Sequence, residues 1–269
     1  MNYQERVDSL LTQLSGMPGA VVAFSGGVDS SALLFACKLS LGEKVVAVTA
    51  DSPSLPRQEL ADARSFAAEI GVEHQVIATT ELSRSEYTRN ASDRCYFCKT
   101  ELFSVMVREL RAISVPDWPI LYGAIGDDYD DHRPGARAAV DHGVLAPLAE
   151  LDFTKDEVRR FSREHRLTTA DKPSFACLAS RVPYGTPVTS EVLARLEQAE
   201  TVLRELGYRQ YRVRHHGTVA RVEILPDEFT KAMTLDRDRI VEGVRAAGYT
   251  YVALDLQGYR TGSLNEVLN

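Results

Sequence analysis

One loop constrains this chain more than any other segment: it reads Ser-Gly-Gly-Val-Asp-Ser over residues 25–30. It follows a short apolar run at 20–24, which predicts a buried strand, and precedes apolar spacing at 29–41 that predicts a helix. The glycines allow a tight turn and close approach to a ligand, and the first N–H groups of the helix favour phosphate. The loop lacks the spacing and the lysine of a Walker A motif. A glycine-rich turn without a ligand is the alternative.

Strand-like and helix-like segments alternate over the first two-thirds of the chain. Strands are expected at 20–24, 44–50, 73–79 and 120–123, and helices at 29–41, 57–70, near 99–113 and after the capping box Thr154-x-x-Glu157. This alternation predicts an α/β fold with a Rossmann-like parallel sheet covered by helices on both faces.

The pattern changes after a proline-containing connector at 171–187. The remaining elements are expected to be a helix with an apolar stripe from Val192 to Leu206, strands at 211–215 and 219–225, a helix near 228–247 and a strand at 250–255. We therefore expect a domain over 1–186 that includes the connector, and a smaller C-terminal α+β domain over 187–269 for substrate binding or oligomerisation.

Composition excludes several classes of protein. The 269 residues are 44% hydrophobic and 26% charged, which is ordinary for a globular protein. Apolar runs are shorter than the roughly 18–20 residues of a membrane span, and the first residues resemble no signal peptide. We expect a cytoplasmic protein without a membrane partner. The net charge of −7 argues against a broad grip on nucleic acid, so we expect none, and we expect a homo-oligomer.

The loop resembles the SGG-x-DS fingerprint of the PP-loop ATP pyrophosphatases, which include NAD synthetase, GMP synthetase and tRNA-thiolating enzymes. The resemblance implies a domain that binds ATP, cleaves it to AMP and pyrophosphate, and forms an adenylated intermediate. It assigns the pyrophosphate to Ser25, Gly26, Gly27, Asp29 and Ser30, with Asp29 near Mg²⁺. It also places the adenine beside the end of the second strand, near residues 49–52.

An acidic segment follows the strand expected at 120–123. Gly123 and Asp127 open it, and Asp128, Asp130 and Asp131 follow. Carboxylates at the carboxyl end of a strand suit a Mg²⁺ ion held against phosphates. A solvated acidic loop is the alternative.

Four segments together resemble the LarE family, whose members insert sulfur in the synthesis of a nickel-pincer nucleotide cofactor. They are residues 123–135, 180–185, Arg212-x-Arg214 and 254–262, so the similarity spans nearly the whole chain. The resemblance implies that a carboxylate of a pyridinium dicarboxylate mononucleotide is adenylated and becomes a thiocarboxylate. It assigns nucleotide or substrate binding to Gly123, Asp127, Ser180, Arg212 and Arg214, and metal or substrate binding to Glu200.

The charged residues also suggest roles by their positions. Arg212 and Arg214 share one face of an expected strand, so both could meet one phosphate, although solvated arginines are the alternative. Arg181, close to Cys177, is the better candidate for a buried partner, and we expect it to act in catalysis. Glu200 interrupts an apolar stretch, and an ordinary exposed helix residue is the alternative reading.

The cysteines predict a metal or redox centre. Cys95-x-x-Cys98 lies just before the helix expected at 99, and Cys177 lies in the connector. Three thiolates could ligate a [4Fe–4S] cluster and leave one iron open for sulfide. A zinc site and a redox or structural pair remain alternatives. Cys37, inside the first helix, is expected to be a buried hydrophobe.

The cysteine pattern departs from the best-known form of the LarE family, in which a single connector cysteine gives up its own sulfur. Cys177 stands one residue closer to Arg181 than in that form. We therefore expect a cluster supplied by external sulfide or another sulfur donor, with Cys177 essential in either mechanism. A tRNA-thiolating PP-loop enzyme and a nucleotide-binding regulatory module without chemistry are the rival functions.

Overall fold

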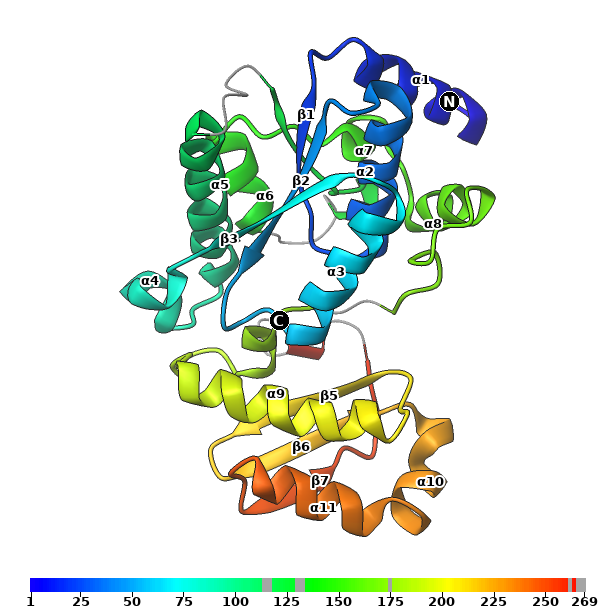
Figure 1. The fold of residues 1–269 in the computed structure, drawn as a ribbon. Helices are drawn as coiled ribbons and strands as arrows, with labels where there is room; N and C mark the ends of the chain where they lie inside the picture. Colours follow the sequence, from blue (N-terminus) through cyan, green and yellow to red (C-terminus); the bar gives the residue numbers. More distant parts are fainter. Residues whose placement is uncertain (113–117, 129–133, 174–175, 261–262, 265–269) are drawn as a thin grey trace. The chain divides into compact units, whose positions relative to one another are not determined.

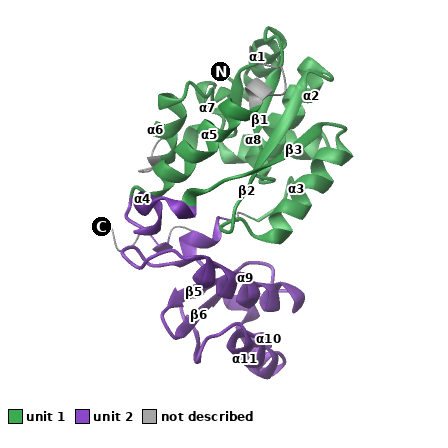
Figure 2. Cartoon of the chain, turned by 60° about the vertical axis from the view of Figure 1, so that its left-hand side comes forward, with its two compact units in different colours: residues 1–81, 93–174 green, residues 82–92, 175–269 purple. Residues whose placement is uncertain are grey.

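The computed structural model describes residues 1–112, 118–128, 134–173, 176–260 and 263–264. The chain divides into two compact units (Figure 2), with residues 1–81 and 93–174 in unit 1 and residues 82–92 and 175–269 in unit 2. The expected boundary at 186 thus lies inside unit 2, because the last part of the connector packs with the C-terminal elements. A domain over 1–186 stays a prediction.

Unit 1 contains a parallel sheet of strand order β3-β2-β1-β4 (Figure 1), which confirms the predicted Rossmann-like α/β fold. The strands are β1 (Ala20–Ala23), β2 (Val45–Asp51), β3 (Glu73–Ala78) and β4 (Ile120–Tyr122). Val22 of β1 faces one hydrophobic core and Val21 faces the other. A strand buried on both faces is apolar throughout, as in β1.

Helices cover both faces of this sheet. The first core receives α1 (Tyr3–Ser15), α2 (Val28–Leu41), α3 (Arg57–Glu69) and α8 (Lys155–Glu164). The second core receives α5 (Arg94–Ala112) and α6 (Pro134–Asp141), and the short helix α7 (Pro147–Glu150) completes the unit. Cys37 of α2 is fully buried in the first core, as predicted. None of the helices in the described ranges has the length and apolar character needed to cross a membrane.

The helix expected near 99–113 begins earlier than predicted. Helix α5 starts at Arg94, so Cys95 and Cys98 lie within its first turns rather than before it. Asp93 precedes the helix, and aspartate favours helix starts, which the sequence reading missed. Because residues three apart share one face of a helix, the two thiols lie on the same side of α5.

Unit 2 is a small α+β unit, as predicted, in which helices pack on one face of a mixed sheet. Strand β5 (Tyr211–His216) pairs antiparallel with β6 (Val219–Ile224), which pairs parallel with β7 (Tyr251–Leu254). Helices α9 (Ser190–Glu205) and α11 (Arg237–Ala246) contact β5 and β7 respectively. The short helix α4 (Ser85–Thr88) also belongs to this unit.

The prediction of a single helix near 228–247 is wrong. The chain forms a short 3-10 turn (Pro226–Glu228), α10 (Phe229–Thr234) and then α11, with a break at Asp236. The carboxylate of Asp236 accepts the hydroxyl of Tyr208 at 3.1 Å, and its N–H donates to Lys231. These bonds fix a turn that the apolar spacing did not reveal.

Candidate functional site

The phosphate loop closes on itself at the start of α2. Gly26 has φ +74°, where a side chain would be strained and would also meet Ala63 of α3 at 3.1 Å. The hydroxyl of Ser30 donates to the carbonyl of Gly27 at 3.0 Å and lies 3.1 Å from the hydroxyl of Ser25. Gly27 caps α2 without a side-chain hydrogen bond, so the first N–H groups of the helix have no capping side chain. This arrangement suits an anionic ligand.

A lysine that sequence reasoning missed joins this loop. Nζ of Lys155 lies 2.8 and 2.7 Å from the two carboxylate oxygens of Asp29. The backbone N–H of Lys155 donates to Oδ2 of Asp127 at 2.9 Å. Asp29 and Asp127, both predicted as site residues, therefore bond to the same residue, Lys155, at the start of α8. The capping box Thr154-x-x-Glu157 marked this helix start, and both of its hydrogen bonds are present.

Two glycines in the segment after β4 allow close packing around this group. A Cβ at Gly123 would lie 2.8 Å from the backbone nitrogen of Ser30, and a Cβ at Gly126 would lie 2.6 Å from Oδ1 of Asp152. The sequence predicted Gly123 as a nucleotide-binding residue, and the structure gives it a packing role beside the loop. The side chains of Asp128, Asp130, Asp131 and Arg133, and Gly262, lie outside the described residues.

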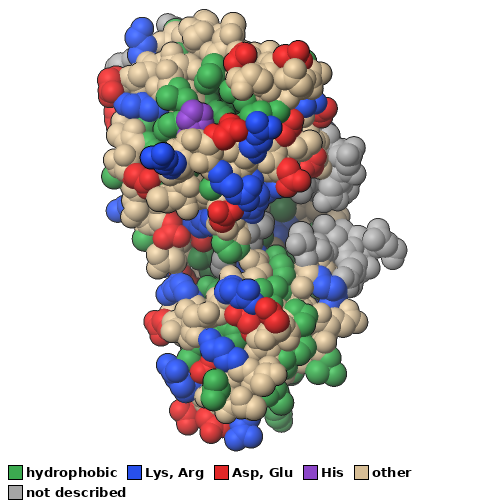
Figure 3. Space-filling view, turned by 90° about the vertical axis from the view of Figure 1, so that its right-hand side faces the viewer, with side chains coloured by type: hydrophobic (Ala, Val, Ile, Leu, Met, Phe, Trp, Pro, Cys, Tyr) green, Lys and Arg blue, Asp and Glu red, His purple; other side chains and the backbone are tan. Residues whose placement is uncertain are grey.

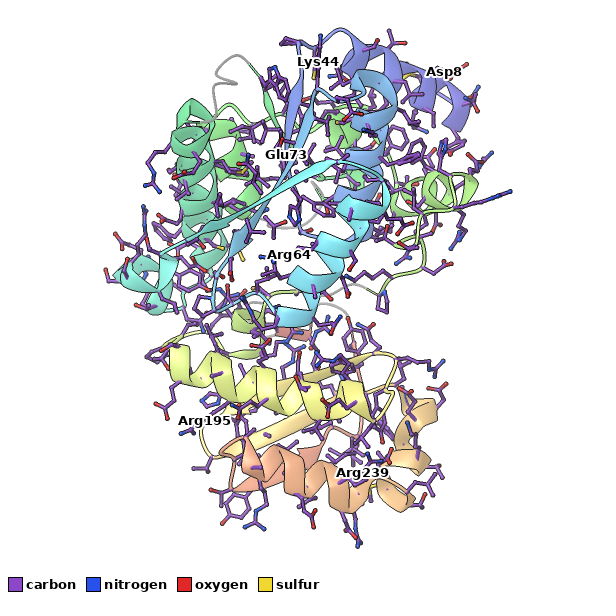
Figure 4. All side chains as sticks on the ribbon, in the orientation of Figure 1. Asp8, Lys44, Arg64, Glu73, Arg195 and Arg239 are labelled. Atoms are coloured by element: carbon purple, nitrogen blue, oxygen red, sulfur yellow. The ribbon has the colours of Figure 1, made fainter. Side chains whose placement is uncertain are left out.

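A polar group lies between β2 and the edge strand β3, close to the expected adenine region. Thr49 donates to the carbonyl of Phe24 at 2.6 Å and lies 2.8 Å from Nε2 of His74. Because the threonine proton is used, Nε2 donates, and Nδ1 is a buried acceptor without a hydrogen-bond partner in the described part of the chain. Burial, and then Arg64 on α3 (Figure 4), lower the pKa of His74, so the imidazole is neutral at about pH 7.

In unit 2, Arg181 lies at the end of a 3-10 turn (Leu178–Arg181) and is fully buried. Its guanidinium forms a bidentate salt bridge with the carboxylate of Glu200 of α9, with hydrogen bonds of 2.9 and 3.0 Å. Burial alone would lower the pKa of Arg181, but the Glu200 carboxylate outweighs it and raises this pKa. Glu200 is also buried and accepts the N–H of Val213 at 3.0 Å, so the alternative of an exposed helix residue is excluded.

The remaining nitrogen of Arg181 holds the backbone that carries Cys177. It donates to the carbonyls of Ala176 at 2.6 Å and Cys177 at 3.0 Å, and to the hydroxyl of Ser180 at 2.9 Å. The same hydroxyl donates to the Cys177 carbonyl at 2.7 Å. Arg181 therefore fixes the turn that presents the Cys177 side chain.

The guanidinium of Arg214 donates its hydrogen bonds to other groups of the protein. It forms a bidentate salt bridge with the carboxylate of Glu223 of β6, with hydrogen bonds of 3.0 and 2.9 Å, and both side chains are buried. Its other donors reach the carbonyl of Ser180 at 2.8 Å and the hydroxyl of Ser263 at 2.7 Å. Arg214 thus ties β5 to the turn that contains Ser180.

Arg212, on the same face of β5, lies in a different environment. Burial, and then the neighbouring Arg181, lower the pKa of Arg212 to about 10, so it stays cationic at about pH 7. Its guanidinium carbon lies 5.1 Å from the ring centroid of Tyr259. Three buried arginines, Arg181, Arg212 and Arg214, thus lie near the buried carboxylates of Glu200 and Glu223. Buried guanidinium groups can bind a phosphate through charge-assisted hydrogen bonds.

Cysteines lie in both units. None of the four cysteines, all of which are described, forms a disulfide. Cys177 is partly exposed in unit 2, and Cys95 and Cys98 lie in unit 1. Among the residues that the structure describes, no three His, Cys, Asp or Glu side chains are grouped to hold a metal ion. The predicted metal roles of Asp29, Glu200 and the three cysteines therefore stay predictions.

Comparison with known proteins identifies the family. The chain is 40% identical over 266 residues to an uncharacterized protein of Synechocystis sp., which covers 98% of each chain. It is 34% identical over 261 residues to pyridinium-3,5-bisthiocarboxylic acid mononucleotide synthase of Lactiplantibacillus plantarum, which covers 97% of this chain and 94% of the relative. The chain belongs to the LarE family.

Shorter matches agree with a PP-loop domain in the N-terminal part of this LarE-family chain. The family model of queuosine biosynthesis protein QueC matches residues 19–101, which contain the phosphate loop. The NH(3)-dependent NAD(+) synthetase of Archaeoglobus fulgidus is 30% identical over 92 residues, which is 31% of this chain and 37% of the relative. The LarE relationship covers both units, whereas these matches are partial.

Proposed function

We propose that this LarE-family chain is an ATP- and Mg²⁺-dependent sulfur transferase that adenylates a carboxylate of a pyridinium dicarboxylate mononucleotide and converts it to a thiocarboxylate. The observation that carries this proposal is the full-length similarity to a pyridinium-3,5-bisthiocarboxylic acid mononucleotide synthase. The phosphate loop of unit 1 and the buried arginines of unit 2 support it independently.

ATP binds at the loop of unit 1. The uncapped start of α2 and the hydroxyls of Ser25 and Ser30 are placed to contact the pyrophosphate part of ATP. Asp29 and Asp127 supply the hard carboxylate oxygens that Mg²⁺ prefers. Lys155, bonded to Asp29 by its side chain, is placed to transfer that contact to a phosphate when Mg²⁺ takes the carboxylate.

The mononucleotide phosphate binds in unit 2. We assign the phosphate to Arg212, which lies close to Arg181 and to the ring of Tyr259, on the same face of β5 as Arg214. Arg181 and Arg214 each bind a buried carboxylate. Ser180 adds a hydroxyl beside them. Arg214, held by Glu223, donates to the carbonyl of Ser180, so we assign Arg214 a supporting part in phosphate binding.

The chemistry needs the adenylate because a carboxylate is a poor acyl donor. A substrate carboxylate oxygen attacks the α-phosphorus of ATP, the bond to the bridging oxygen breaks, and pyrophosphate leaves. Sulfide then attacks the acyl carbon and AMP leaves with the electron pair of the carbon–oxygen bond. The product is a thiocarboxylate, and no change of oxidation state is required.

Cys95, Cys98 and Cys177 are the residues that would hold a [4Fe–4S] cluster. Their chemistry fits, because all three are thiols rather than disulfides and two lie one helical turn apart. When bound, such a cluster would keep one iron open to sulfide from an external donor. We further propose a cytoplasmic homo-oligomer with no nucleic-acid partner. On the face drawn in Figure 3, Lys and Arg side chains are interspersed with Asp and Glu.

Pyrophosphate release tests the proposal. Purified protein with Mg²⁺ and ATP should release pyrophosphate only when the pyridinium dicarboxylate mononucleotide is present. The variant Asp29→Ala should abolish the release, and Gly27→Val should do the same by blocking the loop. Release that persists in both variants, or that needs tRNA rather than the mononucleotide, would overturn the assignment.

A further inference from the structure

A loop over residues 182–188 joins the Arg181 turn to α9 and has no helix or strand of its own. Pro183 and Pro187 lie within it, and proline has no N–H group. The carbonyl groups of such a loop must find donors outside regular secondary structure.

One buried side chain supplies these donors. Nδ2 of Asn90 donates to the carbonyls of Val182 at 3.2 Å, Pro183 at 2.9 Å and Thr186 at 2.9 Å. The carbonyl of Asn90 accepts the N–H of Gly185 at 3.0 Å. Asn90 is fully buried, and its segment, residues 82–92, packs within unit 2 although it lies between strands of unit 1 in sequence (Figure 2).

Asparagine suits this position for two reasons. Asn90 has φ +56°, a left-handed conformation that asparagine tolerates better than most residues. Its amide carries two N–H donors, which three carbonyls share. Aspartate would tolerate the same backbone but would face the carbonyls with an acceptor.

The loop continues directly from the turn that carries the reactive residues. The Arg181 guanidinium holds the carbonyls of Ala176 and Cys177, and Arg214 holds that of Ser180. Asn90 holds the carbonyls that come next. Side chains therefore fix this backbone from Ala176 to Thr186.

We propose that Asn90 is a positioning residue that fixes the turn presenting Cys177, Ser180 and Arg181, acting through the loop at 182–188. Its importance for the reaction rests on the proposed function. The hydrogen bonds from Asn90 to the loop do not depend on the proposed function, so the two parts of the proposal can be tested separately.

Hydrogen exchange of the backbone amides tests whether Asn90 holds the loop, and it needs no measurement of enzyme activity. The variant Asn90→Gly keeps the left-handed backbone and removes only the amide. Arg166→Gly is the matched control, since Arg166 has φ +57° but is exposed. Exchange over 182–188 should rise about tenfold in Asn90→Gly and stay unchanged in the control. Unchanged exchange in Asn90→Gly would overturn the proposal. If this variant does not fold, Asn90→Ser, which keeps one donor, should show a smaller rise.

Kinetics then separate positioning from general stability. At a temperature where the variant is folded, Asn90→Gly should lower kcat for thiocarboxylate formation about tenfold or more. Its affinity for ATP should match that of the wild type. Faster exchange with unchanged kcat would show that the loop does not position the reaction, and equal losses of ATP affinity would indicate general damage. If the wild type forms no thiocarboxylate, the proposed function is wrong. The exchange result would still show whether Asn90 holds the loop over 182–188.

Discussion

Lys155 contacts both carboxylate oxygens of Asp29, at 2.8 and 2.7 Å, although 126 residues separate them in sequence. The contact joins the first residue of α8 to the first turn of α2, at the phosphate loop. It brings a lysine, which the loop itself lacks, next to the loop.

Replacing Lys155 should therefore weaken ATP binding. Loss of a charge-assisted contact to phosphate costs about 1.5–3 kcal/mol, so Lys155→Ala should raise KM for ATP by about 10- to 100-fold. Lys38→Ala is the control, because Lys38 pairs with Glu43 at the other end of α2. Steady-state pyrophosphate release measures both. An unchanged KM in Lys155→Ala would restrict this lysine to a structural role.

The two arginines of β5 should behave differently. Arg212→Ala should chiefly raise KM for the mononucleotide and leave ATP binding intact, because we assign Arg212 to the mononucleotide phosphate. Arg214→Ala leaves Glu223 buried without its main partner, and breaking such a pair costs about 3–5 kcal/mol of folding free energy. Urea unfolding and substrate titration of each variant check this. Equal effects of both variants on KM and stability would contradict the distinction.

Acid should destabilise the fold through two histidines, His74 and His215. Burial lowers the pKa values of His74 and His215 below 6.5, so the unfolded chain binds protons first as the pH falls. Their contribution to the free energy of unfolding is present above pH 6.5 and is lost as the pH falls through the lowered values. Urea unfolding between about pH 7.5 and 5.5 should show this loss, with a shallower slope in His74→Gln. An unchanged slope in His74→Gln would contradict this account.

The cysteines should act as one site if they hold a cluster. After anaerobic purification, Cys95→Ala, Cys98→Ala and Cys177→Ala should each lose iron and visible absorbance to a similar extent. Cys37→Ala is the control, because Cys37 is buried in α2 and burial raises the pKa of its thiol to about 12. An iron-free enzyme that turns over once and ends with dehydroalanine at position 177 would establish sacrificial transfer instead.

Local patterns predicted the elements that surround the phosphate loop. The apolar run before Ser25 and the helical spacing after Asp29 depend on neighbouring residues, so β1 and α2 were expected within one residue of their ends. The parallel sheet followed from the alternation of strands and helices. The early start of α5 and the break at Asp236 depend on single polar residues that periodicity does not detect.

Long-range relationships could not be predicted from the same patterns. Neither the Lys155–Asp29 contact nor the Arg181–Glu200 pair is visible as a spacing, because each joins elements that only the folded chain brings together. The packing of residues 82–92 in unit 2 was missed for the same reason. Arg212 and Arg214 were expected to be equivalent, since strand alternation gives their face but not their partners.

The mass of the small-molecule product tests the central claim most directly. Wild-type protein, reconstituted anaerobically with iron and sulfide, should be incubated with Mg²⁺, ATP and the pyridinium dicarboxylate mononucleotide. Mass spectrometry should then find the mononucleotide with one carboxylate oxygen replaced by sulfur, together with AMP and pyrophosphate, and only when ATP is present. An unchanged mononucleotide, with or without ATP hydrolysis, would contradict the account.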